Sequence, residues 1–121
     1  MGQFLKEGIV CQILKSLEIA KLYQKELGNS EQAISYYEKA QLLSPKDISI
    51  LNELEILYNQ LEDFNKLIQT LELKAQLLTD FKESAETLYQ AGTIYEDKLD
   101  NKEKASKLYK ETLAKYPELK E

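Results

Sequence analysis

Residues 88–117 read LYQAGTIYEDKLDNKEKASKLYKETLAKYP, and this stretch decides the fold. Apolar side chains recur in it at steps of three and four residues, first between Leu88 and Leu99 and again between Ala105 and Leu113. That spacing places them on one face of an α-helix, so the stretch predicts two amphipathic helices. The polar pair Asp100-Asn101 between them is too short for any connection except an antiparallel hairpin turn.

The same hairpin pattern occurs 72 positions earlier, in residues 16–45. The matching pairs are Tyr23 with Tyr95, Leu27 with Leu99, Asn29 with Asn101, Glu31 with Glu103, Ala33 with Ala105, Tyr37 with Tyr109, and Pro45 with Pro117. A weaker third copy lies between them, with Leu51, Leu54, Tyr58, Asp63, Leu67 and Leu71 at corresponding places. An offset of about twice 34–38 residues with one copy in between is typical of helical repeats. The single valine and the abundance of Leu, Glu, Lys, Ala and Gln also favour an all-α fold.

Polar residues and prolines mark where the second helix of each copy begins and ends. Asn29, Asp63 and Asn101 are predicted N-caps, because their side chains can accept from amides that the first helical turn leaves unpaired. Pro45 and Pro117 are predicted to end the second helices of copies one and three, since proline cannot continue the hydrogen-bond ladder. The repeated tyrosines are predicted to pack between helices with their hydroxyls at the rim; a ring-stacking platform is the alternative.

These residues carry a family resemblance. Leu88-x2-Ala91-Gly92-x2-Tyr95, then Ala105-x3-Tyr109 and Pro117, closely resembles the tetratricopeptide repeat (TPR) consensus. Copy one resembles it through Ile19, Ala20, Tyr23, Ala33, Tyr37, Ala40 and Pro45. Copy two is degenerate, with Glu55, Leu67 and Thr79 at the small-residue, alanine and proline places. Copies one and three each carry one extra residue between their halves, which lengthens the first helix or its turn.

The resemblance implies a right-handed α-solenoid of three antiparallel helix hairpins, a TPR-like superhelix of about six helices. We expect a single domain over residues 1–121, with repeats at approximately 14–46, 47–80 and 82–117. Residues 1–13 are expected to be an N-terminal extension of the first helix.

The resemblance also implies a binding face. Proteins of this family typically hold a peptide or a partner's helix on the concave face, which the first helices line. The residues that map to this face are Glu18, Lys21, Asn52, Glu53, Ile56, Asn59, Glu86, Tyr89, Gln90 and Thr93. The alternative is that these are ordinary solvated helix faces. A polar and acidic groove favours a basic or amphipathic helical ligand.

One sub-family clamps the carboxylate at the end of chaperone tails with Lys, Asn and Arg at set groove positions. The corresponding places in this chain hold Leu17, Lys21, Glu53, Glu86 and Gln90. Only Lys21 could contribute, and two glutamates would repel a carboxylate. The sequence therefore predicts that this chain is not a chaperone-tail clamp.

Composition excludes several other function classes. The chain has a net charge of −5 and no arginine, which disfavours nucleic-acid binding. Without histidine, neither a metal site nor a general base is expected, so we predict no enzyme activity and no cofactor. The single cysteine, Cys11, is expected to be a small buried hydrophobe beside Ile9, Val10 and Ile13. A lone thiol fits a reducing, cytoplasmic compartment, and no segment is apolar enough for membrane insertion.

The ends of the array suggest an alternative role. No polar capping helix follows Pro117, and Phe4, Leu5, Ile9, Val10 and Ile13 add apolar surface before the first repeat. We expect a fragment of a longer repeat array or, as the alternative, a structural spacer or homo-oligomer that associates through uncapped ends. The primary prediction remains a non-catalytic module whose partner is another protein.

Overall fold

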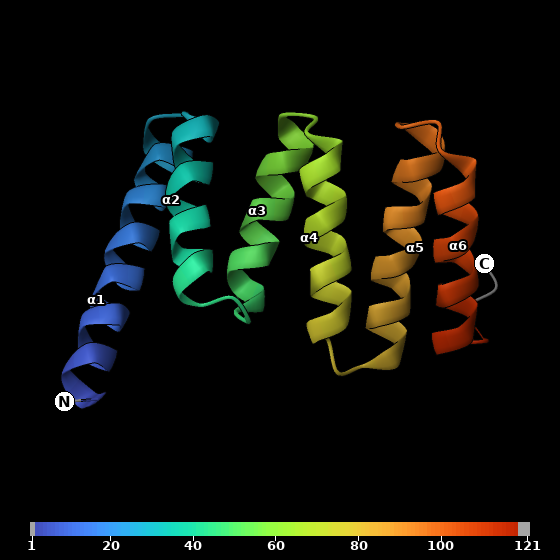
Figure 1. The fold of residues 1–121 in the computed structure, drawn as a ribbon. Helices are drawn as coiled ribbons and strands as arrows, with labels where there is room; N and C mark the ends of the chain where they lie inside the picture. Colours follow the sequence, from blue (N-terminus) through green and yellow to red (C-terminus); the bar gives the residue numbers. More distant parts are fainter. Residues whose placement is uncertain (1, 119–121) are drawn as a thin grey trace. The chain divides into compact units, whose positions relative to one another are not determined.

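The computed structural model describes residues 2–118 of the chain, with side chains from Glu7 onward. It is all-helical, and no strand occurs in this range. The elements are α1 (Gly2–Lys21), the short π-helix η1 (Leu22–Glu26), α2 (Ser30–Leu43), α3 (Ile48–Gln60), α4 (Phe64–Leu77), α5 (Phe81–Asp97) and α6 (Lys102–Lys115) (Figure 1). The prediction of an all-α fold with about six helices is confirmed.

The helices belong to two compact units. The N-terminal unit extends to Leu57 and the C-terminal unit begins at Tyr58, so the boundary falls within α3. In the N-terminal unit α1 and α2 lie side by side as an antiparallel hairpin, and α5 and α6 form the equivalent hairpin of the C-terminal unit (Figure 1). The C-terminal hairpin was predicted from the periodicity of its apolar residues, and the N-terminal one from its match to that pattern 72 positions earlier.

Leucine, isoleucine and alanine side chains fill the core of each unit, together with Tyr37 in the first and Tyr58 in the second. In the N-terminal unit the buried set includes Ala20, Ala33, Ile34, Tyr37, Ala40, Ile50, Leu51, Leu54 and Leu57. In the C-terminal unit it includes Tyr58, Leu67, Ile68, Leu71, Ala75, Ala85, Leu88, Ala91, Ala105 and Leu108. Ser84 is also buried, and its Oγ donates to the backbone oxygen of Ala75 at 2.7 Å, which links α5 to α4. A buried hydroxyl with a partner does not incur the cost of an unpaired polar group.

The caps of the second helices lie where the sequence predicts them. The side-chain oxygens of Asn29, Asp63 and Asn101 accept from backbone amides three residues ahead, at 3.1, 3.3 and 3.1 Å. α2 ends at Leu43 and α6 at Lys115, just before the two prolines. Each second helix therefore has a chemically fixed start and, in copies one and three, a fixed stop.

The extra residue of copies one and three is absorbed in the last turn of the first helix. In copy one the amide of Leu27 donates to the oxygen of Leu22 at 3.0 Å, and in copy three that of Leu99 donates to Ile94 at 3.2 Å. These bonds span five residues instead of the usual four, which is the geometry of a π-type turn. The insertion therefore changes the direction in which the last residues of η1 and α5 point, and both hairpins still form.

The turn after each first helix passes through the left-handed region. The φ angles of Gly28, Glu62 and Asp100 are 60°, 57° and 49°. Glycine reaches this region without a steric penalty, whereas Glu62 and Asp100 bear a small backbone cost there. In copies one and three the next amide, of Asn29 and Asn101, then bonds back across the turn at 2.8 Å.

Gly92 marks the closest approach of α5 and α6. A Cβ atom at this position would lie 2.7 Å from Cε1 of the Tyr109 ring. The corresponding pair in copy one is Ala20, which is fully buried, and Tyr37, which is 1% exposed. The small residue and the tyrosine of each hairpin thus occupy the same layer, as the repeat pattern predicts.

Cys11 corrects one expectation. Its side chain is exposed, and Val10 beside it is 52% exposed. The cause is length: α1 has 20 residues and α2 has 14, and α1 runs past the end of α2 (Figure 1). The first turns of α1 therefore extend beyond the helix that would cover them. The side chains of Phe4 and Leu5, also expected to be apolar surface here, lie outside the described residues.

The cap of α6 gives a stability prediction. Replacing Asn101 with Ala leaves the amide of Lys104 unpaired and should lower the free energy of unfolding by about 1 kcal/mol. Asn101→Asp keeps an acceptor at the same place and should change stability much less. Urea unfolding followed by circular dichroism measures both. Equal losses in the two variants would show that the cap is not what stabilises this turn.

Candidate interaction surfaces

The predicted binding residues lie on the first helices α1, α3 and α5. The N-terminal unit contains Glu18, Lys21, Asn52, Glu53 and Ile56, and the C-terminal unit contains Asn59, Glu86, Tyr89, Gln90 and Thr93. Eight of the ten are exposed, while Glu53 and Thr93 are half-buried. The exposed residues are therefore accessible to a ligand in each unit.

In the C-terminal unit the residues from α5 meet an aromatic partner from α6. The rings of Tyr89 and Tyr109 lie with their centroids 5.5 Å apart at an interplanar angle of 38°. The Tyr109 hydroxyl donates to Oε1 of Glu96 at 2.7 Å. Glu86 is exposed on the same helix, one turn before Tyr89. The tyrosines and carboxylates of this hairpin form what we call the α5 aromatic–acidic surface: Glu86, Tyr89, Gln90, Glu96 and Tyr109.

The chemistry of the Tyr109 hydroxyl reflects this setting. Burial raises its pKa to about 12, and the hydrogen bond to Glu96 and the charge of that carboxylate raise it in the same direction. Electrostatic interaction with Tyr89 and with the Asp97 carboxylate adds to the effect. A hydroxyl surrounded by negative charge stays protonated and acts as a hydrogen-bond donor. The α5 aromatic–acidic surface therefore combines a negative electrostatic potential with partly exposed aromatic rings.

The N-terminal unit repeats this contact with different partners. The Tyr37 hydroxyl donates to Oε1 of Gln24 at 2.8 Å, across the same 13-residue separation as Tyr109 and Glu96. Burial raises the pKa of Tyr37 to about 12, and the nearby carboxylate of Glu53 on α3 raises it in the same direction. Glu53 is half-buried itself.

Two predicted residues have local roles as well. The hydroxyl of Thr93 donates to the backbone oxygen of Gln90 at 2.7 Å, within its own helix. Ile56 is 48% exposed on α3 and presents apolar surface to solvent. Thr93 therefore has less free hydrogen-bonding capacity for a ligand than Gln90 has.

Sequence reasoning missed Gln24 and Glu96, which fix the tyrosine hydroxyls. The signal was available, because both lie 13 residues before a repeated tyrosine and 72 positions apart. It was overlooked because each contact joins the two helices of a hairpin, and apolar spacing along one helix does not show which polar side chains of the two helices meet.

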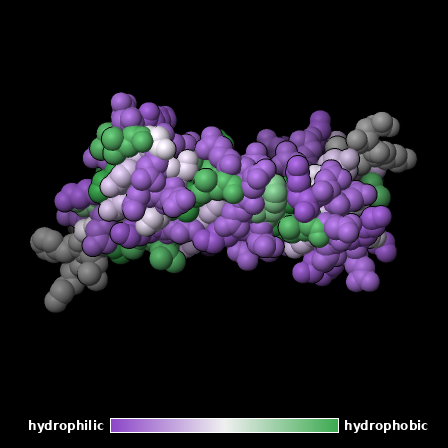
Figure 2. Space-filling model, turned by 90° about the horizontal axis from the view of Figure 1, so that it is seen from above, coloured by the Kyte–Doolittle hydropathy of each residue, from purple (hydrophilic) through white to green (hydrophobic). Residues whose placement is uncertain are grey.

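Other kinds of site find no support in the part of the chain that is described. Among residues 2–118 no helix combines the length and apolar character that a bilayer crossing needs. No three acidic, cysteine or histidine side chains in that range converge as metal ligands. Hydrophilic residues dominate the face seen in Figure 2, and hydrophobic ones appear there as separate patches.

The two tyrosines with raised pKa predict how stability depends on alkaline pH. Their folded-state pKa of about 12 lies above the ordinary value of 10.0, so their contribution is fully present below pH 10. It should be lost as the pH rises from 10 to 12, because the unfolded chain releases these protons first. Denaturant unfolding across this window should show a fall that is smaller in the Tyr37→Phe/Tyr109→Phe variant. Parallel losses in both proteins would contradict the assignment.

Comparison with known proteins places these features in context. A tetratricopeptide repeat family model matches residues 16–47, and a second tetratricopeptide repeat model matches residues 86–118. No curated protein matches the chain by sequence. Among solved structures, the N-terminal domain of stress-induced protein-1 (STI-1) from C. elegans aligns with 92% of this chain and 89% of its own, at 19% identity and a TM-score of 0.68.

The family matches fall on copies one and three, the two hairpins that keep the small residue, the tyrosine and the terminal proline. Together they cover more than half of the chain. The structural likeness independently gives the same fold. Tetratricopeptide repeats generally mediate protein–protein interactions and are non-catalytic modules. The chain belongs to the tetratricopeptide repeat family.

Proposed function

We propose that this protein is an interaction module that binds a peptide or helical segment of another protein on the face of its first helices. The family supports the general role, and the α5 aromatic–acidic surface is the observation that carries the specific one. Tyr89 is 43% exposed although its ring contacts Tyr109, so the aromatic pair is accessible to a ligand. Large exposed aromatic rings are typical anchors of protein interfaces.

The negative charge of this surface favours a positively charged ligand. Glu86 and Asp97 are exposed on α5, and Glu96 is held beside the tyrosine pair. Carboxylates next to aromatic faces favour lysine and arginine side chains, which gain both charge attraction and cation–π contact. The chain itself shows this preference, since the ammonium of Lys104 lies 5.6 Å from the centroid of the Tyr95 ring. We infer that the bound segment is basic, or amphipathic with a basic flank.

The N-terminal unit offers a milder version of the same surface. Gln24 replaces the carboxylate that Glu96 provides, and Lys21 adds a positive charge nearby on α1. The exposed face of this unit thus has less negative charge than the α5 surface.

A matched pair of variants tests this proposal. Glu86→Lys/Gln90→Lys reverses the charge of the α5 surface and should weaken binding of a fluorescent, lysine-flanked amphipathic peptide by at least about tenfold. Ser106→Lys/Glu111→Lys makes the same charge change on exposed positions of α6 and should leave the affinity unchanged. Fluorescence anisotropy titration measures both.

Equal affinities of the two variants for the peptide would show that the α5 surface is not the binding site. So would a lysine-flanked peptide that fails to bind the parent protein.

A second prediction concerns chaperone tails. Glu53 and Glu86 occupy clamp positions, and each would repel a terminal carboxylate. Titration with a labelled chaperone-tail peptide should therefore give no saturable binding. Micromolar binding that disappears when the peptide is amidated at its C-terminus would overturn this prediction.

A further inference from the structure

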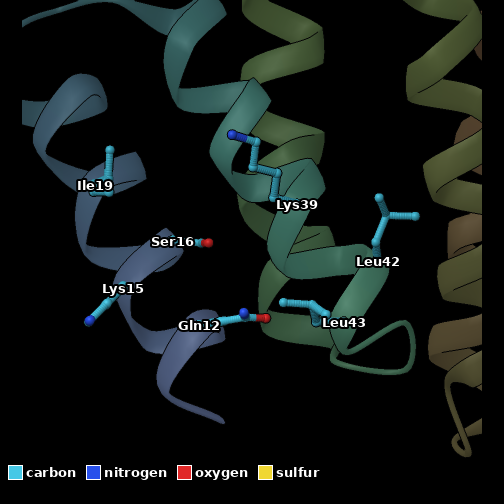
Figure 3. Close-up of a pocket in the computed structure, with 7 residues that line it drawn as sticks. All are labelled: Gln12, Lys15, Ser16, Ile19, Lys39, Leu42 and Leu43. Atoms are coloured by element: carbon cyan, nitrogen blue, oxygen red, sulfur yellow. The ribbon is translucent and has the colours of Figure 1, made fainter. Parts of the chain in front are cut away.

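A second concave surface lies between α1 and α2, within the N-terminal unit. It is an open groove of about 420 Å³, lined by Gln12, Lys15, Ser16 and Ile19 from α1 and by Lys39, Leu42 and Leu43 from α2 (Figure 3). Its size lies within the range of sites that hold ligands or partner side chains. The lining residues come from two neighbouring helices, so the groove follows the hairpin.

This groove is distinct from the first-helix face described above. Ile19 of the groove and Lys21 of that face are two positions apart, which places them about 200° apart around α1. Lys15 of the groove and Glu18 of that face are three positions apart and are therefore neighbours on the helix. The groove also draws residues from α2, whereas the predicted binding residues lie on first helices. The groove is therefore separate from the α5 surface, which belongs to the other unit, and meets the first-helix face only along α1.

The floor of the groove is apolar and accessible to solvent. Leu42 is 82% exposed, and Ile19 and Leu43 are 36% and 37% exposed. Three branched aliphatic side chains that flank one groove form a local apolar patch, and such patches on a surface with polar rims are characteristic of interaction sites. Figure 3 shows Gln12 and Ser16 reaching from α1 toward α2 across this floor. They supply hydrogen-bonding groups beside the aliphatic side chains.

The charge of the groove is opposite to that of the chain. Its seven lining residues include Lys15 and Lys39 and no acidic residue, although the chain has a net charge of −5. The two lysines stand on different helices and thus on opposite sides of the groove (Figure 3). Lys39 is further positioned by the ring of Tyr36, whose centroid lies 4.4 Å from its Nζ atom. Both lysines are exposed; in Figure 3 the side chain of Lys39 points toward α1, and that of Lys15 points away from α2.

We propose that this groove docks an amphipathic helix of a partner protein, with an apolar stripe flanked by aspartate or glutamate. The stripe covers Ile19, Leu42 and Leu43, and the acidic flanks meet Lys15 and Lys39. An open apolar groove lined by two neighbouring helices suits the docking of a third helix by its apolar face. Charge at the rim then sets orientation and partner choice, since exposed pairs contribute more to specificity than to affinity.

The same charges disfavour two other occupants. A second copy that presented the same groove would bring lysines against lysines. The outer face of α6, another surface that a second copy could present, carries Glu103, Ser106, Lys107, Lys110, Glu111 and Ala114 and lacks large apolar side chains. An anionic bilayer is disfavoured because membrane-binding segments carry clusters of about four to eight basic residues, whereas this groove has two lysines and the chain has a net charge of −5.

Three synthetic peptides and two matched variants test the proposal. The peptides are a glutamate-flanked amphipathic helix, a scrambled version of it without a stripe, and a lysine-flanked counterpart. The variants are Lys15→Glu/Lys39→Glu in the groove and Lys107→Glu/Lys110→Glu on exposed positions of α6. Each purified protein is titrated by fluorescence anisotropy, and circular dichroism confirms that the variants remain folded.

We expect saturable 1:1 binding of the glutamate-flanked peptide, weakened at least about tenfold by Lys15→Glu/Lys39→Glu and unchanged by the α6 variant. Glu86→Lys/Gln90→Lys should leave this binding unchanged, so this proposal and the proposed function can fail separately.

Four results would overturn the proposal. The first is no binding, and the second is equal binding of the scrambled peptide. The third is dimerisation of the parent protein that the groove variant abolishes, measured by analytical ultracentrifugation, which would identify a second copy as the occupant. The fourth is binding to anionic vesicles that depends on the same two lysines, which would assign the groove to a membrane surface.

Discussion

The packing of one tyrosine against one small residue is the constraint on which both terminal hairpins depend. At Gly92 the helices approach so closely that even a methyl group would press on the Tyr109 ring, and Ala20 and Tyr37 occupy the same layer in copy one. Close packing of this kind tolerates little change in volume. It limits the spacing of the two helices, and the tyrosine hydroxyls bond to Gln24 and Glu96 near the ends of the first helices.

The same contact links the fold to the surface. The hydroxyls of Tyr37 and Tyr109 meet Gln24 and Glu96, which lie where the π-type turn rotates the end of the first helix. A residue inserted in the turn is thus tolerated because the tyrosine can satisfy a polar side chain there. The two hairpins have the same architecture and differ in charge, because the tyrosine hydroxyl bonds to the amide of Gln24 in one and to the carboxylate of Glu96 in the other. Repeat proteins commonly diversify their surfaces in this way while conserving the layer beneath.

Two surfaces of opposite character result from this scaffold. The α5 surface combines tyrosines with carboxylates, and the α1–α2 groove combines aliphatic residues with lysines. They lie on different units and draw on different helices. A module with two surfaces of this kind would discriminate partners by the sign of their charge, because like charges placed together are costly.

The sequence alone determined the helices, their caps and the family, because apolar spacing, Asn29, Asp63, Asn101 and the two prolines act over a few residues. It also placed Tyr89 and Gln90 on an exposed helix face. It could not show that Cys11 is exposed, since burial depends on where α2 ends relative to α1. Nor could it find the Glu96 contact or the groove at Leu42, because both arise from two helices brought together in space. Local signals determine helices, whereas burial, pKa and surface shape depend on neighbours that only the tertiary structure provides.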